Sequence, residues 1–173
     1  PGGAAIRFKA IERTGAIEWE SGTIVVNGTV SMNGAQATHS NKGGGAGGSV
    51  LFVAKKISGF GVVKAEGGDR YGTSRGGGGG GGRIAFHCVT SNQLNEPYNL
   101  ALGDALRVSQ TLSYLSVLGG KGGLVDGSSA SGHAYGGPGT VYESWYSLSD
   151  AIGVEPPVYD RLSVNHDGRS HLN

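Results

Sequence analysis

The sequence predicts an all-β fold in which repeated units stack on one another, a solenoid with glycine-rich returns. Three observations carry this prediction. The chain repeats itself with an offset of 33 residues, so that 28–34 superposes on 61–67 and 43–48 on 76–81. Glycine supplies 35 of the 173 residues. Strand signals are short and bounded by turn residues, whereas helix signals are weak, and such a repeat is typical of units that bury one face on the next.

The strands are expected where apolar and polar residues alternate between glycine and asparagine turns. The expected strands are 5–9, 16–20, 23–26, 29–32, 50–54, 62–65, 83–89, 140–142 and 160–164. Turns are expected at Asn27-Gly28 and Asn33-Gly34. Residues 91–110 break the pattern and are expected to form an irregular insertion, with a short helical turn or an irregular strand at 100–106. Each unit thus reads as strand, turn, strand and a glycine-rich excursion back to the start.

Equivalent apolar residues of successive units are expected to stack into columns that no single unit could bury alone. The shift of 33 residues carries Ile24 onto Ile57. The expected columns of the longer strands are Ile6, Leu51 and Ile84, and Phe8, Val53 and Phe86. Those of the shorter strands are Val30, Val63 and Leu115, and Met32, Ala65 and Val117.

Composition limits the class of protein. The chain is long enough for one domain with a core, so 1–173 is interpreted as a single glycine-rich module. Because it begins at Pro1 with a repeat already under way, it is interpreted as a fragment of a longer chain. A formal net charge of +1 gives no electrostatic case for binding nucleic acid. No stretch approaches 18 apolar residues, so membrane insertion is not expected.

Two segments resemble a known class of proteins. The run 81–86, Gly-Gly-Arg-Ile-Ala-Phe, resembles glycine-rich secreted or surface proteins of the right-handed parallel β-helix, pectin-lyase-like, type. The segments 139–142 and 162–170 resemble the way modules end in those proteins. The resemblance implies a parallel β-helix and an extracellular or cell-surface location. The alternative fold is a β-sandwich with an inserted polyglycine-II bundle, in which 91–118 would supply further strands.

The glycine runs have three interpretations. The run 43–48 matches the spacing G-x-G-x-x-G, but it opens a strand rather than a helix, which disfavours a nucleotide site. The runs could be flexible loops, because glycine is entropically unfavourable to order. They could instead pack, since chains without side chains approach closely and hydrogen-bond to one another. The glycines expected to be structural are Gly43, Gly45, Gly48, Gly76, Gly79 and Gly82.

The sequence contains no recognisable catalytic constellation, so the protein is not expected to be an enzyme. Pectin-lyase-like enzymes use clustered acidic residues or Ca²⁺ with a basic residue, and no acidic pair of that kind is present. The histidines lack metal-ligand spacing, and neither a metal nor a cofactor is expected. The lone Cys88 is interpreted as a small buried hydrophobe, with an intermolecular disulfide and a catalytic thiol as alternatives. Asn27-Gly28-Thr29 is a formal N-glycosylation sequon that also fits a turn.

Two functions are expected from these observations. The first is an extracellular structural module that stacks or polymerises into a fibre, surface appendage or matrix, with copies of itself or neighbouring modules of the same array as partners. The second is a carbohydrate-binding module of a secreted or cell-surface protein, with glycans as partners. Aromatic residues that could stack on sugars, or equally pack in cores, are Trp19, Tyr135, Tyr142, Trp145 and Tyr146.

Overall fold

The computed structural model describes the greater part of the chain as strands and extended segments. Its described residues are 2–10, 12–14, 17–19, 22–40, 42–54, 56–72, 76–90, 112–124, 133–147 and 159–164. These residues contain no helix, so the all-β prediction is confirmed, and accordingly none is long and apolar enough to cross a membrane. The predicted insertion at 91–110 lies outside the described residues.

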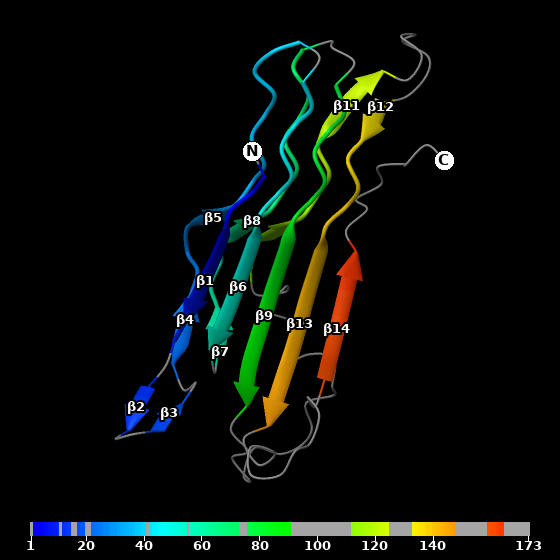
Figure 1. Cartoon of the computed structure of the whole chain (residues 1–173). Helices are drawn as coiled ribbons and strands as arrows, with labels where there is room; N and C mark the ends of the chain where they lie inside the picture. The colour runs from blue at the N-terminus through cyan, green and yellow to red at the C-terminus, as the bar shows by residue number, and fades with distance from the viewer. Residues whose placement is uncertain are drawn as a thin grey trace.

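A five-stranded sheet forms one layer of the protein (Figure 1). Its strands, in spatial order, are β1 (Ala5–Lys9), β6 (Ser49–Ala54), β9 (Arg83–Thr90), β13 (Thr140–Ser147) and β14 (Tyr159–Val164). The first four strands are parallel, whereas β14 runs antiparallel to β13. The four parallel strands therefore follow chain order across the sheet, as stacked repeats require.

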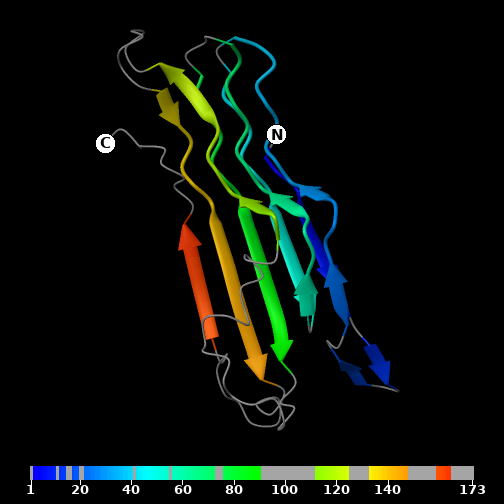
Figure 2. The same ribbon diagram turned by 180° about the vertical axis from the view of Figure 1, so that it is seen from behind.

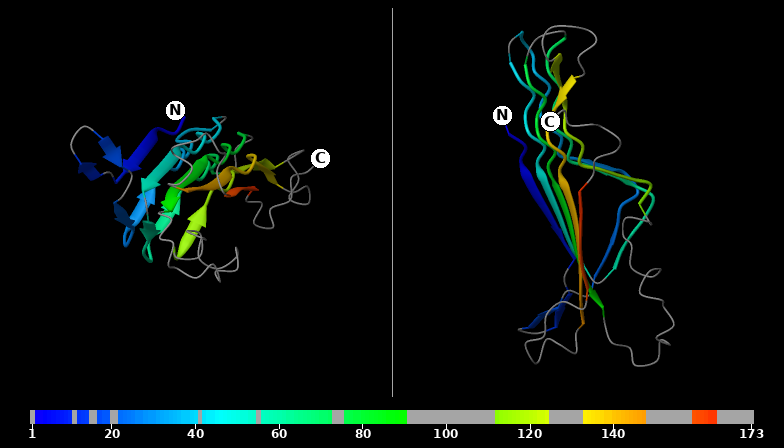
Figure 3. Two further views of the ribbon diagram at one scale, coloured as in Figure 1. Left: turned by 90° about the horizontal axis from the view of Figure 1, so that it is seen from below. Right: turned by 90° about the vertical axis from the view of Figure 1, so that its right-hand side faces the viewer.

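Short parallel strands form a second layer behind this sheet (Figures 2 and 3). β4 (Thr23–Val25) pairs with β7 (Lys56–Ser58), and β8 (Val62–Lys64) lies between β5 (Thr29–Ser31) and β10 (Tyr114–Ser116). Because β4 and β5 both pair with the following unit, the Asn27-Gly28 segment between them is a bend within one unit and not a hairpin turn.

Glycine-rich segments extend beyond both layers at the top of Figure 1. Each unit sends an outgoing arm (32–40, 65–72 and 117–124) away from the second layer. A returning arm (42–48, 76–82 and 133–139) then leads into the next strand of the five-stranded sheet. Near its tip the third pair of arms forms an antiparallel ladder between β11 (Lys121–Leu124) and β12 (His133–Tyr135). A separate hairpin, not expected from the sequence, joins β2 (Glu12–Thr14) and β3 (Ile17–Trp19).

The core lies between the two layers and is built from columns of equivalent residues. Phe8, Phe52 and Phe86 are register partners, and their rings stack with centroids 5.1 and 5.2 Å apart. Phe52 and Phe86 are fully buried, whereas Phe8, on the first strand, is partly exposed. A second column joins Ile6, Val50 and Ile84.

This register corrects two of the predicted columns. Leu51 and Val53 were expected beside Ile84 and Phe86, but they pair with Ala85 and His87. In the five-stranded sheet the repeat offset is 34 between β6 and β9, while it is 33 between β5 and β8. A slip of one residue moves every side chain to the opposite face, which is why the core contains Val50 and Phe52 instead.

In the second layer the predicted columns agree with the structure. Ile24 pairs with Ile57, and Val63 pairs with both Val30 and Leu115. The backbone of Met32 donates to Lys64 at 2.8 Å and that of Ala65 to Ser116 at 2.8 Å, so the same register continues into the outgoing arms. Ala65 and Val117 are fully buried.

Candidate functional site

The glycine arms form a packed array rather than separate loops. Outgoing and returning arms alternate, and each arm donates a backbone hydrogen bond to the arm before it. The bonds run from Gly45 to Ala35 (2.8 Å), Gly68 to Gly45 (2.8 Å), Gly79 to Gly68 (2.9 Å), Gly120 to Gly79 (2.8 Å) and Gly136 to Gly120 (2.8 Å). A continuous backbone network of this kind satisfies amides that the arms would otherwise leave unpaired.

The array has no room for side chains at most of its glycines. A Cβ built on Gly79 would lie 2.0 Å from the carbonyl oxygen of Gly45, and one on Gly82 would lie 2.0 Å from that of Gly48. For Gly48 and Gly76 the nearest backbone oxygens are at 2.1 and 2.2 Å, and for Gly43 at 3.0 Å. Gly45 both donates to Ala35 and accepts from Gly68.

Side chains appear only where the array ends. Gly68 and Gly120 face the preceding outgoing arm, with a Cβ position 2.0 Å from a carbonyl oxygen there, and the equivalent residue of the first arm is the exposed Ala35. On the opposite side, the equivalents of Gly47 and Gly81 and of Gly44 and Gly78 are Pro138 and Tyr135 in the last returning arm. Gly47 and Gly81 donate to the following returning arm, a bond that proline cannot make. The array is therefore bounded on both sides by its own sequence.

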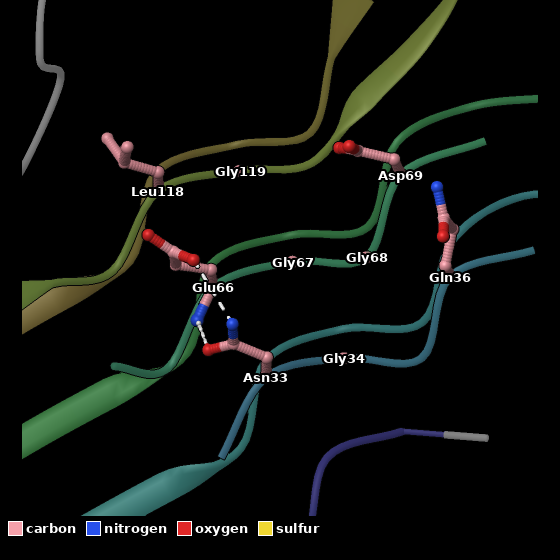
Figure 4. Close-up of a pocket in the computed structure, with 9 residues that line it drawn as sticks. All are labelled: Asn33, Gly34, Gln36, Glu66, Gly67, Gly68, Asp69, Leu118 and Gly119. Carbon is pink, nitrogen blue, oxygen red and sulfur yellow. Dashed lines mark hydrogen bonds between the residues drawn. The ribbon is translucent and has the colours of Figure 1, made fainter. Parts of the chain in front are cut away.

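A polar groove of about 270 Å³ crosses the outgoing arms (Figure 4). Its lining residues are Asn33, Gly34, Gln36, Glu66, Gly67, Gly68, Asp69, Leu118 and Gly119. Across neighbouring arms, Asn33 Nδ2 donates to Glu66 Oε2 at 3.1 Å, and Asn33 Oδ1 accepts from the backbone of Glu66 at 2.9 Å. These residues occupy equivalent places one repeat apart, so the contact cross-links two units.

The two carboxylates of the groove are used within the fold. Ser116 Oγ donates to Glu66 Oε1, and the backbone of Lys121 donates to Asp69 Oδ1 at 2.6 Å. Among the residues that the structure describes, no group of three His, Cys, Asp or Glu side chains could hold a metal ion. The groove therefore joins adjacent arms, and it offers polar groups but no assembled reactive centre.

Arg70 ties the outer ends of two arms together. It was expected to be a solvated surface charge next to Asp69, but it is buried, with 9% of its surface exposed. Its Nε donates to the carbonyl of Gly122 at 2.6 Å and its Nη1 to that of Gly72. No sequence pattern indicates this role, because the bonds go to backbone oxygens of glycines, one of them distant in the chain.

Cys88 lies on the core face of β9 and is a free, buried thiol, 4% exposed. Burial raises its pKa from 9.0 to about 12, with a smaller contribution from the nearby Glu143 carboxylate. The thiol is thus protonated at neutral pH and is not poised as a nucleophile, since the thiolate is the reactive form. An intermolecular disulfide at Cys88 would first require the core to open.

The raised pKa predicts an alkaline loss of stability. Because the folded thiol has a higher pKa than the 9.0 of an ordinary one, its linked stability is fully present below pH 9 and is lost as the pH rises toward 12. Cys88→Ala removes this component, so the difference in free energy of unfolding between the two proteins should narrow above pH 9. Chemical denaturation at pH 8, 9, 10 and 11 measures it. A difference that stays constant would contradict the assigned burial.

A serine and a histidine on the other face of the sheet also lie close together. Ser144 Oγ is 2.7 Å from His87 Nδ1, and the His87 ring is 5.7 Å from that of Tyr142. Sequence patterns did not pair these residues, because they lie on strands 57 positions apart. Ser144 is fully buried, so its hydroxyl does not reach a substrate in this conformation, and the contact joins β9 to β13.

The remaining predicted sites are dispersed. Asn27 is exposed, and its Oδ1 accepts from the backbone of Phe60 at 3.4 Å. Tyr135 lies at the tip of the last returning arm and Tyr142 on β13, where the guanidinium of Arg83 is 5.9 Å from its ring centroid. The side chains of Trp19, Trp145 and Tyr146 lie outside the described set.

Comparison with protein-family models, with curated proteins and with solved structures finds no match for this chain. Any function proposed for it therefore depends on the architecture itself.

Proposed function

We propose that the chain is an extracellular structural module that assembles with copies of itself or with neighbouring modules into a fibre, surface appendage or matrix. The carrying observation is that its units stack in a single direction with a continuous register from β1 to β13. The outer edge of β1 pairs with no other described strand. An open parallel edge presents a row of backbone donors and acceptors that another chain can use.

The finer fold proposal is a parallel β-helix with glycine-rich excursions. Its support is the repeated path of each unit: a long strand, short parallel strands of the second layer, and a pair of arms. In this proposal the module is non-enzymatic, because its buried polar groups bond to one another and its groove cross-links arms. The extracellular or cell-surface location follows from the resemblance, and Asn27, being exposed, remains a candidate for N-glycosylation.

Carbohydrate binding is the less supported function. The groove presents amides and carboxylates, but none of its lining residues is aromatic, and stacking on an aromatic ring was the expected mode of sugar recognition.

Electron microscopy of the purified chain over a range of concentrations tests the structural proposal. Regular filaments or sheets with a fixed spacing are expected. Monodisperse particles at every concentration and ionic strength would overturn it, and a glycan-array screen would then be the informative experiment.

A further inference from the structure

We propose that copies of this chain join head to tail, with β1 of one copy pairing antiparallel to β14 of the next. This inference deepens the proposed function and rests on it. The two strands form the opposite ends of the five-stranded sheet. Within the described chain, the outer edge of neither strand is paired. A simple translation along the sheet brings them together in antiparallel orientation, because β14 alone runs opposite to the other four strands.

The hydrogen-bonding parity of β1 identifies which residues face outward. Ala4 accepts from Ser49 at 2.9 Å and Ala10 donates to Val53 at 3.0 Å, so the even-numbered residues bond toward β6. In a parallel ladder alternate residues bond to opposite sides. The backbone groups of Ala5, Arg7 and Lys9 therefore point to the open edge.

The parity of β14 follows from its pairing with β13. Thr140 donates to Gly82 at 3.0 Å, so even-numbered residues of β13 bond toward β9 and odd-numbered ones toward β14. Val141 pairs with Ser163 and Glu143 with Arg161, which directs the odd-numbered residues of β14 inward. The outward backbone groups of β14 are then those of Asp160, Leu162 and Val164.

The two sets of outward residues match. Following the register across the sheet, Lys9 is level with Val53, His87, Ser144 and finally Asp160. By the same steps Arg7 is level with Leu162 and Ala5 with Val164. The resulting hydrogen-bonded pairs would be Lys9 with Asp160, Arg7 with Leu162 and Ala5 with Val164. No shift of register is needed, and the first pair joins opposite charges, which stabilises a cross-strand contact.

The core side of the junction is also complementary. Phe8 ends the stack of three rings and keeps one side partly exposed. The register places Arg161 of the next copy level with Phe8. An arginine beside an open aromatic face is a favourable combination of residue types.

Charge also selects against the symmetric alternative at β1. A two-fold β1–β1 pair centred on Arg7 would bring its cation opposite itself, and like charges directly opposite are destabilising. A two-fold β14–β14 pair centred on Leu162 has no such conflict. It would produce a closed dimer, whereas the head-to-tail contact is heterologous and produces an open polymer.

The ends of the glycine array fit a junction of this kind. Returning arms lead into β6, β9 and β13, so an arm is absent beside β14. Adjacent arrays in the polymer would then be separated by a gap, and Ala35, Tyr135 and Pro138 carry side chains where a directly abutting arm would need bare backbone. One copy contributes five strands, so the polymer should repeat every ~24 Å along its axis, given a strand spacing of ~4.8 Å.

The test uses charge reversal in the whole chain. Lys9→Glu and Asp160→Lys should each raise the critical concentration for assembly about five- to tenfold, measured by sedimentation and negative-stain microscopy. Lys42→Glu, a reversal of the same charge on an exposed residue of a glycine arm, should leave it unchanged. Circular dichroism and thermal melting confirm that each variant folds.

Mixing the two single variants gives the decisive outcome. Equal amounts of Lys9→Glu and Asp160→Lys should assemble together with the wild-type critical concentration. Alternating copies would bring the introduced glutamate opposite the introduced lysine at one junction, and the native Lys9 opposite the native Asp160 at the next. Every junction of the mixed polymer would therefore join opposite charges.

Three outcomes would count against these proposals. Filaments that respond equally to Lys9→Glu and Lys42→Glu, or mixtures that do not recover, would overturn the β1–β14 junction while leaving self-assembly intact. Discrete dimers indifferent to Lys9→Glu would also overturn that junction. A wild-type chain that never assembles would overturn the proposed function as well.

Discussion

Gly79→Val is expected to destabilise the protein by more than ~3 kcal/mol or to prevent folding. The valine Cβ would lie 2.0 Å from the carbonyl oxygen of Gly45 and 3.1 Å from the nitrogen of Ala46. These are backbone atoms in the middle of the array, so they cannot rotate away as the end of a side chain could. The arms would have to separate, which would break the bonds from Gly79 to Gly68 and from Gly120 to Gly79. Overpacking at so restricted a site belongs to the large end of single-substitution effects.

Gly77→Val is the matched control. Gly77 lies in the same returning arm, its φ is not in the left-handed region, and nothing lies within 4 Å of its Cβ position. The valine should therefore change the free energy of unfolding by no more than ~0.5 kcal/mol, as surface substitutions usually do. The midpoint of urea unfolding measures both variants. Equal effects of the two substitutions would mean that the arms are not packed as the structure has them.

The glycine repeat predicted stacked units but could not fix their register. The offset of 33 residues holds from Ile24 to Ile57 and from Val30 to Val63, and it fails by one residue between Phe52 and Phe86. Asp69 still follows the offset of 33, whereas Gly79, the equivalent of Gly45, follows one of 34. The extra residue thus lies near the tip of the second pair of arms. A run of identical glycines superposes equally well under either shift, so the sequence carries no signal for it.

The ends of the molecule were also beyond the sequence pattern. The final strand was expected from its alternation, but alternation is the same for parallel and antiparallel strands, and it could not show that β14 reverses direction. Ala35 and Pro138 look like ordinary interruptions of glycine-rich segments. Only the positions of neighbouring carbonyl oxygens at Gly68, Gly120 and Gly81 reveal that these interruptions coincide with the boundaries of the array.

Phe52→Ala is expected to cost ~3–5 kcal/mol in free energy of unfolding, as truncation of a buried phenylalanine generally does. Phe52 is the middle ring of the column, stacked on Phe8 with an interplanar angle of 13° and on Phe86 with one of 9°. Its removal leaves a cavity between β1 and β9 and separates the first unit from the rest of the core. Rigid backbone ladders on both sides prevent the strands from closing over the gap.

The effect of each phenylalanine should depend on its place in the column. Phe8→Ala removes a partly exposed end ring with one stacking neighbour, so it should cost clearly less than Phe52→Ala. Phe60→Ala is the control, because Phe60 is 83% exposed and lies outside the core cluster; its unfolding midpoint should match that of the wild type. Urea unfolding of the three variants gives the order directly. If Phe8→Ala proved as damaging as Phe52→Ala, the first strand would be buried in solution by something else, and a second copy paired to β1 is the occupant that we propose.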